Sequence, residues 1–382
     1  MSRNLIKLIG FVVVLAVGVL VSQSVSGKPV ERLKYPLILE YGDTIRSRGE
    51  AREIIGNVRL RHHKRIITAD RALYDQGAYL LVLNGSVEIV EAEQSLKAEK
   101  VSYNEEFGDY TADGDVEIII GDSVRILADR AIYTEDDSLL NLFNNVIIDN
   151  YRDESRITGR RARWVEGRNE GIIEGDPVYS LPPEDSTSTD SLVIRSKKLK
   201  LDRTASTAQF TGEVRLFRKD IIATADTLFH QPDSNVTLLT GSPHILREGD
   251  ELSGDNVRLE YEKSEWKQII VTGSAEGRSE SKPGDPHRNV LSGQKIEIIA
   301  INDSTSQVRI TGSAKGVYHL WDEKDNYQGV NQSAADSILI VMVNKKTERV
   351  VLTGRTNGTV YPPNITPPEE PAKAGDKKKK KL

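Results

Sequence analysis

Apolar and polar residues alternate along most of the chain, in short runs that recur. A glycine followed by an alternating apolar pair occurs at residues 56–60, 85–89, 114–118 and 212–216. Gly56, Gly85 and Gly114 are 29 residues apart. Looser copies begin at Asn145, Gly175, Gly241, Gly273 and Gly312. Because successive side chains of a strand point to opposite faces, this pattern predicts strands with one apolar face.

Two further segments accompany each glycine. The first has the form Thr/Ser-Ala-Asp/Glu-x-apolar-x-aromatic, and its copies lie at residues 68–74, 97–103, 127–133, 158–164, 195–201, 224–230, 253–259, 292–298 and 334–340. The second is an apolar run that closes each unit at its glycine, as at residues 83–85, 210–212, 239–241, 271–273, 310–312 and 352–354. The sequence therefore predicts an all-β repeat fold of about nine three-strand units, each with a glycine-marked turn.

Stacking of the units is expected to bring the apolar residues of the first segment into one inward column. The candidate column consists of Val58, Leu60, Val87, Ile89, Val116, Ile118, Val146, Ile148, Val214 and Leu216. Alternation slips by one residue at the repeated acid, for example at Asp70, which predicts a bulge or corner and a structural role for the acid. The column forms either an open apolar groove or a closed dry core.

These three segments together resemble the repeat of the OstA/LptA family of lipopolysaccharide-transport proteins, which includes LptA, LptC and the N-terminal domain of LptD. The likeness spans roughly residues 40–361. It implies a β-jelly-roll, that is, a folded-over antiparallel sheet open at one seam around an apolar groove. The candidate column is then the lipid-binding groove. Arg59, Arg71, Arg130 and Arg215 either meet lipid phosphates at the seam or form a solvated strand face.

The resemblance also implies a function and partners. It implies a periplasmic lipopolysaccharide-binding transport protein that shelters the acyl chains of lipid A and bridges the inner and outer membranes. The expected partners are an inner-membrane transporter complex, an outer-membrane assembly protein and further copies of the chain joined end to end. A component of the same pathway anchored in the inner membrane is the alternative. This chain is longer than a typical bridge subunit, and its Pro-rich segment at residues 181–187 suggests two stacked blocks, about 40–180 and 190–361.

The two ends differ in composition from the repeats. Residues 1–27 contain Arg3, Lys7, an apolar run and a stretch of small residues, which is the order of a cleaved signal peptide or of a retained membrane anchor. Either reading predicts an exported chain, with the β-repeat domain at residues 28–361. Residues 362–382 are rich in Pro and Lys and predict a disordered tail. The chain has no cysteine, so neither disulfides nor thiolate metal sites are available.

Composition argues against nucleic acid and against catalysis. The net charge is −5 and basic residues are scattered among acidic ones, so the sequence predicts no nucleic-acid partner. The six histidines have no metal-binding spacing, and His62 and His63 point to opposite faces of a strand. We therefore expect no cofactor, no metal site and no catalytic residues. Two other readings stay open: a parallel β-helix enzyme acting on polysaccharide, and a structural or adhesive surface repeat protein.

Overall fold

The computed structural model describes residues 36–365, apart from 153, 183–190, 219–220, 232–233, 235, 248, 263–264, 283, 303, 323 and 345. The described residues form 26 strands and a short 3-10 helix, Glu166–Arg168. They belong to two compact units, of which the first ends at Gly241 and the second begins at Ser242. The predicted signal or anchor segment, 1–27, and most of the predicted tail, 362–382, lie outside the described residues.

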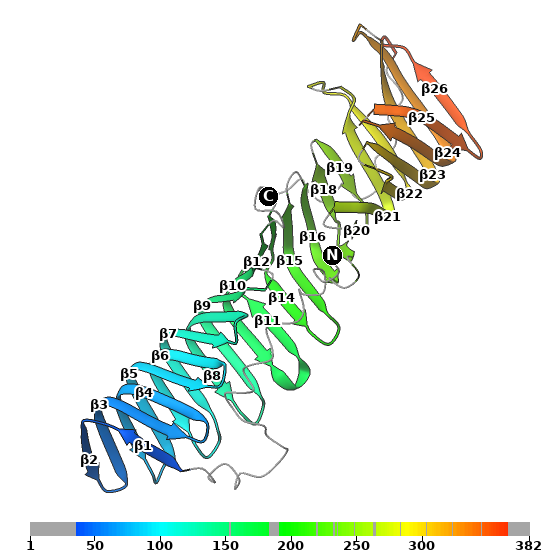
Figure 1. The fold of residues 1–382 in the computed structure, drawn as a ribbon. Helices are drawn as coiled ribbons and strands as arrows, with labels where there is room; N and C mark the ends of the chain where they lie inside the picture. Colours follow the sequence, from blue (N-terminus) through cyan, green and yellow to red (C-terminus); the bar gives the residue numbers. More distant parts are fainter. Residues whose placement is uncertain are drawn as a thin grey trace, which may run out of the picture. The chain divides into compact units, whose positions relative to one another are not determined.

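Strands of the first unit follow one another in chain order (Figure 1). They are β1 (Leu37–Tyr41), β2 (Thr44–Arg48), β3 (Ala51–His62), β4 (Arg65–Asp75), β5 (Leu80–Glu91), β6 (Gln94–Asn104), β7 (Tyr110–Ile120), β8 (Val124–Thr134), β9 (Leu139–Asn150), β10 (Ser155–Val165), β11 (Glu170–Glu174), β12 (Val178–Leu181), β13 (Leu192–Arg195), β14 (Lys198–Asp202), β15 (Thr207–Arg218), β16 (Ile221–Gln231) and β17 (Val236–Thr240). From β3 to β10, each strand pairs antiparallel with the strand before it and the strand after it.

The second unit has the same antiparallel arrangement. Its strands are β18 (His244–Arg247), β19 (Asp250–Ser253), β20 (Asn256–Glu262), β21 (Glu265–Glu280), β22 (Arg288–Ala300), β23 (Thr305–Trp321), β24 (Tyr327–Val343), β25 (Lys346–Thr353) and β26 (Asn357–Tyr361). β21 to β24, which are longer than any described strand of the first unit, pair antiparallel in chain order. Beyond β24, both β25 and β26 pair with it, one along each of its halves.

Each long strand that carries the repeated glycine bends there. In β3, Gly56 and Asn57 have φ angles of 81° and 50°, and these two residues oppose the single Asp70 of β4. A bulge with left-handed backbone at successive residues redirects a strand, and glycine adopts this conformation without a Cβ clash. We call this pair and its equivalents the corner. In β9 the corner is Asn144–Asn145, since asparagine also tolerates positive φ.

The corner divides the first unit into two facing walls. Wall A comprises the arms at residues 37–41, 58–69, 87–98, 116–128, 146–159, 178–181, 192–195 and 214–225, and wall B comprises those at 44–55, 71–84, 100–113, 130–143, 161–174, 198–211 and 227–231. In the described part of the first unit, from β1 to β16, every strand pairing joins arms of the same wall. The predicted fold, an antiparallel sheet folded over on itself and open along one seam, is confirmed.

The predicted turn at the glycine is wrong in its detail. Leu83, from a closing segment, and Val87, from the next opening segment, lie in the same strand, β5. The three segments of a repeat therefore form two strands, one of them bent. The strand continues through the glycine because both arms pair with the same neighbouring strands, β4 and β6.

The repeated acid packs on the corner of the following strand, in the structural role predicted for it. A Cβ atom at Gly85 would overlap the Asp70 carboxylate, and Ser86 Oγ donates to Asp70 Oδ2 over 3.4 Å. The same contact joins Asp43 to Gly56, Glu99 to Gly114, Asp226 to Gly241, Asp255 to Gly273 and Asp336 to Gly354. Glycine at the corner therefore meets two needs, a positive φ and room for the carboxylate.

Two successive repeats exchange the charges at this contact. Arg160 and Lys197 stand where the acid is expected, and Asp176 follows the corner glycine. The Asp176 carboxylate accepts from Arg160 Nη2 over 3.2 Å and from Lys197 Nζ over 3.0 Å. With the charges reversed, the corner at Gly175 still forms ion pairs with the segment before it, through Arg160, and with the segment after it, through Lys197.

The Pro-rich segment does not coincide with the boundary between the compact units. Residues 183–187 of this segment are outside the described part, but β12 and β13 on either side of it pair with each other within the first unit. The two units divide downstream, at Gly241.

Candidate functional site

The inner face of wall A is built from two apolar layers. All ten residues of the predicted column point inward, nine of them buried and Ile89 half-buried. The layer nearer the corner contains Val58, Val87, Val116, Val146 and Val214. The next layer contains Leu60, Ile89, Ile118, Ile148 and Leu216. The two-residue period of the strand places these layers two and four residues beyond each corner.

Wall B supplies an opposing apolar face that the sequence analysis did not select. Leu83, Val101, Ala112, Ala131 and Leu142 are all at most 3% exposed. Leu83 and Leu142 belong to closing segments, and Val101 and Ala131 to the segment that carries the acid. Their signal was present in the repeats, because these apolar positions recur together with those of wall A. The column therefore faces apolar residues, not solvent.

Polar side chains line the seam opposite the corner, which we call the rim. On wall B the aromatic residue that ends the acid-bearing segment lies here, as Tyr74, Tyr103, Tyr133 and Trp164. On wall A the rim contains His62, Arg65, Glu91, Gln94, Asn150 and Ser155. The His62 and Tyr103 rings lie 6.2 Å apart, from wall A and wall B respectively. Aromatic side chains with a polar tip favour such boundaries, since one end is apolar and the other can be wet.

Burial raises the pKa values of several titratable side chains at or beside the rim. Burial raises the pKa of Tyr74 to about 12, and the Glu105 carboxylate, which accepts from the Tyr74 hydroxyl over 3.0 Å, adds to this rise. Burial also raises the pKa values of Tyr103, Tyr110 and Glu105. The tyrosines of the rim are therefore neutral hydroxyl donors.

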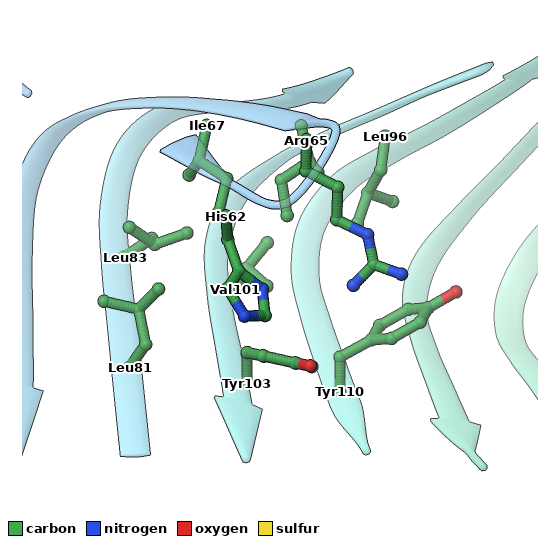
Figure 2. A pocket seen from close by; sticks show the side chains of 10 residues that line it. His62, Arg65, Ile67, Leu81, Leu83, Leu96, Val101, Tyr103 and Tyr110 are labelled. Carbon is green, nitrogen blue, oxygen red and sulfur yellow. The ribbon is translucent and has the colours of Figure 1, made fainter. Parts of the chain in front are cut away.

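Two small cavities lie between the walls of the described first unit. Figure 2 shows the cavity beside Arg65, which is lined by Ile67, Leu81, Leu83, Ile89, Leu96 and Val101 together with rim residues His62, Arg65, Tyr103 and Tyr110. It measures about 30 Å³, and one water molecule needs about 10–15 Å³ of such space. A second cavity beside Trp164 measures about 20 Å³. In this conformation the column is a closed core, and the walls must separate to admit an acyl chain.

The arginines considered for lipid phosphates do not lie at the rim. Arg59 alternates with Val58 and Leu60, so it points outward, where its Nε donates to Glu40 over 3.1 Å. Arg71 pairs with Glu53, and Arg130 pairs with Asp113. Arg215 is likewise exposed, between the buried residues 214 and 216. The solvated-face reading is correct for these arginines, because strand alternation places them on the outer face.

Arg65 is the cationic residue that does reach the cavity. Its Nε donates to Glu91 Oε2 over 2.8 Å, and the two side chains are 14% and 7% exposed. The sequence analysis missed both residues. Glu91 ends a strand and Arg65 follows a hairpin, and charged residues are common at both kinds of position. Arg65 could have been found from alternation, since it lies two residues before the inward Ile67.

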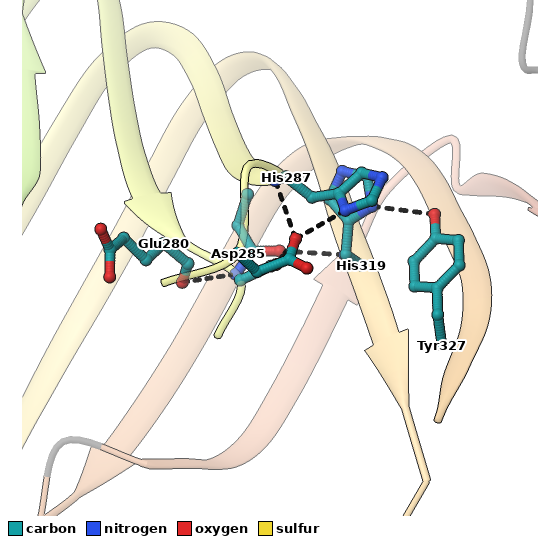
Figure 3. Close-up of polar contacts among 7 residues, drawn as sticks. Glu280, Asp285, His287, His319 and Tyr327 are labelled. Carbon is teal, nitrogen blue, oxygen red and sulfur yellow. Dashed lines mark hydrogen bonds and ion pairs between the residues drawn. The ribbon is translucent and has the colours of Figure 1, made fainter. Parts of the chain in front are cut away.

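The second unit holds a separate cluster of titratable side chains (Figure 3). Asp285 Oδ1 accepts from the His287 backbone N–H over 2.8 Å and lies 2.6 Å from His287 Nδ1. The His287 and His319 ring centroids are 4.7 Å apart, and His319 Nδ1 lies 3.0 Å from the Tyr327 hydroxyl. The hydrogen bonds from His287 lower the pKa of Asp285, and burial lowers the pKa of His319. Ser281 Oγ also donates to Asp285 Oδ1 over 3.5 Å. The cluster therefore holds a carboxylate, two imidazoles and two hydroxyls close together, but the Ser281 hydroxyl is bonded to the carboxylate and not to a histidine.

Neither a metal centre nor a membrane helix is found in the part of the chain that the structure describes. Within residues 36–365 and their gaps, no three or more His, Cys, Asp or Glu side chains are grouped so that they could hold a metal ion. Over the same residues, no helix has the length and apolar character needed to span a bilayer.

Comparisons with known proteins give likenesses among solved structures alone. No protein-family model matches the chain, and no curated protein matches it. Among solved structures, the chain is similar to LptH of Pseudomonas aeruginosa, the LptA-homologous periplasmic component of a lipopolysaccharide transport device. The match has 16% sequence identity and a TM-score of 0.30, and it covers 37% of this chain and 95% of that chain.

Proposed function

We propose that the chain is a periplasmic lipid-transport protein that binds acyl chains of lipopolysaccharide between its two walls. The layered interior of the first unit carries this proposal. Apolar layers continue from repeat to repeat on both walls, and polar tips gather at the rim. This order matches an amphiphile whose tail lies inside and whose head group stays at the rim.

The binding energy needs no chemistry beyond apolar burial. Each methylene removed from water contributes about 0.8 kcal/mol, so about ten methylenes contribute about 8 kcal/mol. A bound chain replaces contacts between the walls with contacts to itself. Because no strand pairing of the described first unit joins the two walls, their separation at the rim breaks no backbone hydrogen bonds.

The partners follow from the same proposal. The chain receives lipopolysaccharide from an inner-membrane transporter complex and delivers it to an outer-membrane assembly protein. Open strand edges favour end-to-end association with further copies. β2 is exposed along its whole length, and β25 is exposed at all but one residue. An inner-membrane-anchored role in the same pathway is the second candidate, supported by the apolar run near the N-terminus.

The proposed function is tested with a photo-reactive residue in the interior and a covalent cross-link between the two walls, which we call the lock across the rim. A photo-crosslinking amino acid at the buried Val87 should form lipopolysaccharide adducts in the source cell, whereas the same residue at Val90, which is 36% exposed, should not. The chain has no cysteine, so His62→Cys with Tyr103→Cys can be joined by a short thiol cross-linker. This lock should abolish the adduct at Val87.

A lock within one wall provides the control. Tyr74 and Glu105 both lie on wall B and are hydrogen-bonded to each other, so cysteines at these positions leave the rim free to open. The adduct at Val87 should persist in this variant. Absence of adducts in the unlocked protein would favour the structural or adhesive alternative, and adducts that survive the lock across the rim would contradict opening of the walls.

A further inference from the structure

We propose that Arg65 binds the anionic group of an acidic amphiphile whose tail occupies the interior of the first unit. The ligand class is an acyl chain that ends in an oxyanion, either a carboxylate or a phosphate. This inference rests on the proposed function and assigns one residue of the rim to head-group recognition. Arg65 and Tyr110 carry it, both lining the cavity in Figure 2.

The Arg65–Glu91 ion pair is placed where stability does not require one. Both side chains are largely withdrawn from water, and their Nε–Oε2 distance is 2.8 Å. Replacement of a buried ion pair by apolar residues is often neutral or stabilising, so such a pair is weak evidence for a stabilising role. Neighbouring repeats have the uncharged residues Gln94, Val124 and Ser155 at the position of Arg65. The fold of the repeat therefore does not depend on a charge at this position.

Tyr110 provides a second donor at the same cavity. The residue is 7% exposed, and its hydroxyl has no hydrogen-bond partner among the described residues. A buried polar group without a partner is disfavoured unless a ligand satisfies it. The Arg65 guanidinium acts electrostatically on this hydroxyl, in the direction that lowers its pKa. One guanidinium and one hydroxyl are thus available to a single oxyanion.

Glu91 acts as an internal competitor for that oxyanion. An incoming carboxylate or phosphate must displace the Glu91 carboxylate from Arg65, and guanidinium binds both groups in the same geometry. Two further carboxylates act on the tyrosines of this cavity. Glu105 accepts from Tyr74, and the charge of Glu135 adds to the rise in the pKa of Tyr110 and of Tyr103. The rest of the lining is mostly aliphatic, so a tail attached to the oxyanion continues into the apolar layers.

The test compares charged and uncharged amphiphiles on the full purified chain. Binding is measured by displacement of the uncharged fluorophore N-phenyl-1-naphthylamine with palmitate, lysophosphatidic acid and hexadecanol. Arg65→Gln should weaken binding of the anions about tenfold or more, since a charge-assisted hydrogen bond is lost. Hexadecanol binding should not change. Arg71→Gln, which removes an outward arginine of the same strand, should change neither.

Glu91→Gln should raise the affinity for the anions, and a misfolded protein would not show such an increase. Without its competitor, Arg65 should bind the anions more tightly, while hexadecanol binding stays the same. A loss confined to palmitate or to lysophosphatidic acid in Arg65→Gln identifies the carboxylate or the phosphate as the ligand. Equal losses for anions and hexadecanol, or equal effects of Arg65→Gln and Arg71→Gln, would overturn the role of Arg65. If no amphiphile binds the unmodified chain, the proposed function fails and this inference fails with it.

Discussion

His230 makes the stability of the first unit sensitive to acid. It lies near the end of β16, its Nδ1 is 2.9 Å from Thr237 Oγ1, and its enclosed Nε2 has no partner among the described residues. Burial, with a smaller contribution from Arg218, lowers the pKa of His230 from its ordinary value of 6.5 to about 4. The folded state therefore favours the neutral ring.

The sign and size of the pH effect follow from this difference. Above pH 6.5 the ring is neutral in both states, and His230 adds no pH dependence. As the pH falls from 6.5 towards 4, the unfolded chain takes up the proton first, so the folded state loses stability. The loss reaches about 3 kcal/mol near pH 4, because each pKa unit corresponds to about 1.4 kcal/mol.

Two measurements check this effect. Proton–carbon NMR of the histidines should show one resonance that titrates near pH 4 and that is missing in His230→Gln. In urea unfolding at pH 7 and pH 4, the wild type should lose about 3 kcal/mol more than His230→Gln. Thr237→Val should leave the pKa low, because burial is the largest cause. A His230 resonance that titrates near 6.5, or equal acid losses in the two proteins, would refute the reasoning.

Two further predictions concern the corner and the inner column. Gly85→Ala combines a φ of 74° with overlap of the Asp70 carboxylate, whereas Gly49→Ala at φ 62° has open space around its Cβ. In urea unfolding, the free energy of unfolding should therefore fall by about 1 kcal/mol in Gly49→Ala and by more in Gly85→Ala. Equal decreases would mean that the packing of Asp70 on the corner does not affect stability. Val87→Asp buries a charge and should unfold its repeat, which circular dichroism would detect. Val90→Asp, on the outer face, should keep a free energy of unfolding within about 0.5 kcal/mol of the wild type in urea. Similar stabilities of the two variants would contradict the assignment of faces.

Local periodicity was enough to predict an all-β repeat chain and its inner column, whereas the folded-over sheet was implied by the resemblance to the OstA/LptA repeat. Side-chain alternation is a property of any strand, so Val58 and Val87 were assigned correctly to the inner face before their partners were known. The slip at Asp70 indicated a bulge for the same reason. The corner itself was mistaken for a turn, because glycine with positive φ serves both and only strand pairing distinguishes them.

The rim could not be predicted because it depends on which strand ends face each other across the seam. His62 and Tyr103 are distant in sequence and belong to different walls. Glu91 does not stand out in the sequence, because strand ends and turns share the same polar composition. Its inward direction follows from alternation, because it lies two residues beyond the inward Ile89, but its pairing with Arg65 of the preceding hairpin does not. The division of the chain at Gly241 was missed for a related reason, since the repeat pattern continues across it.

The two margins of the walls are held by different contacts, and this decides where the interior opens. At the corner, the backbone of β3, β5 and β7 continues from one wall into the other. At the rim of the described first unit, the walls meet through side chains such as His62 and Tyr103. Separation along any other line breaks backbone hydrogen bonds, each contributing about 1 kcal/mol, so the corner acts as the hinge. In the proposed role, a lipid entering at the rim would pass its tail across polar tips into the leucine and isoleucine layer and then the valine layer, and its head group would stay beside Arg65.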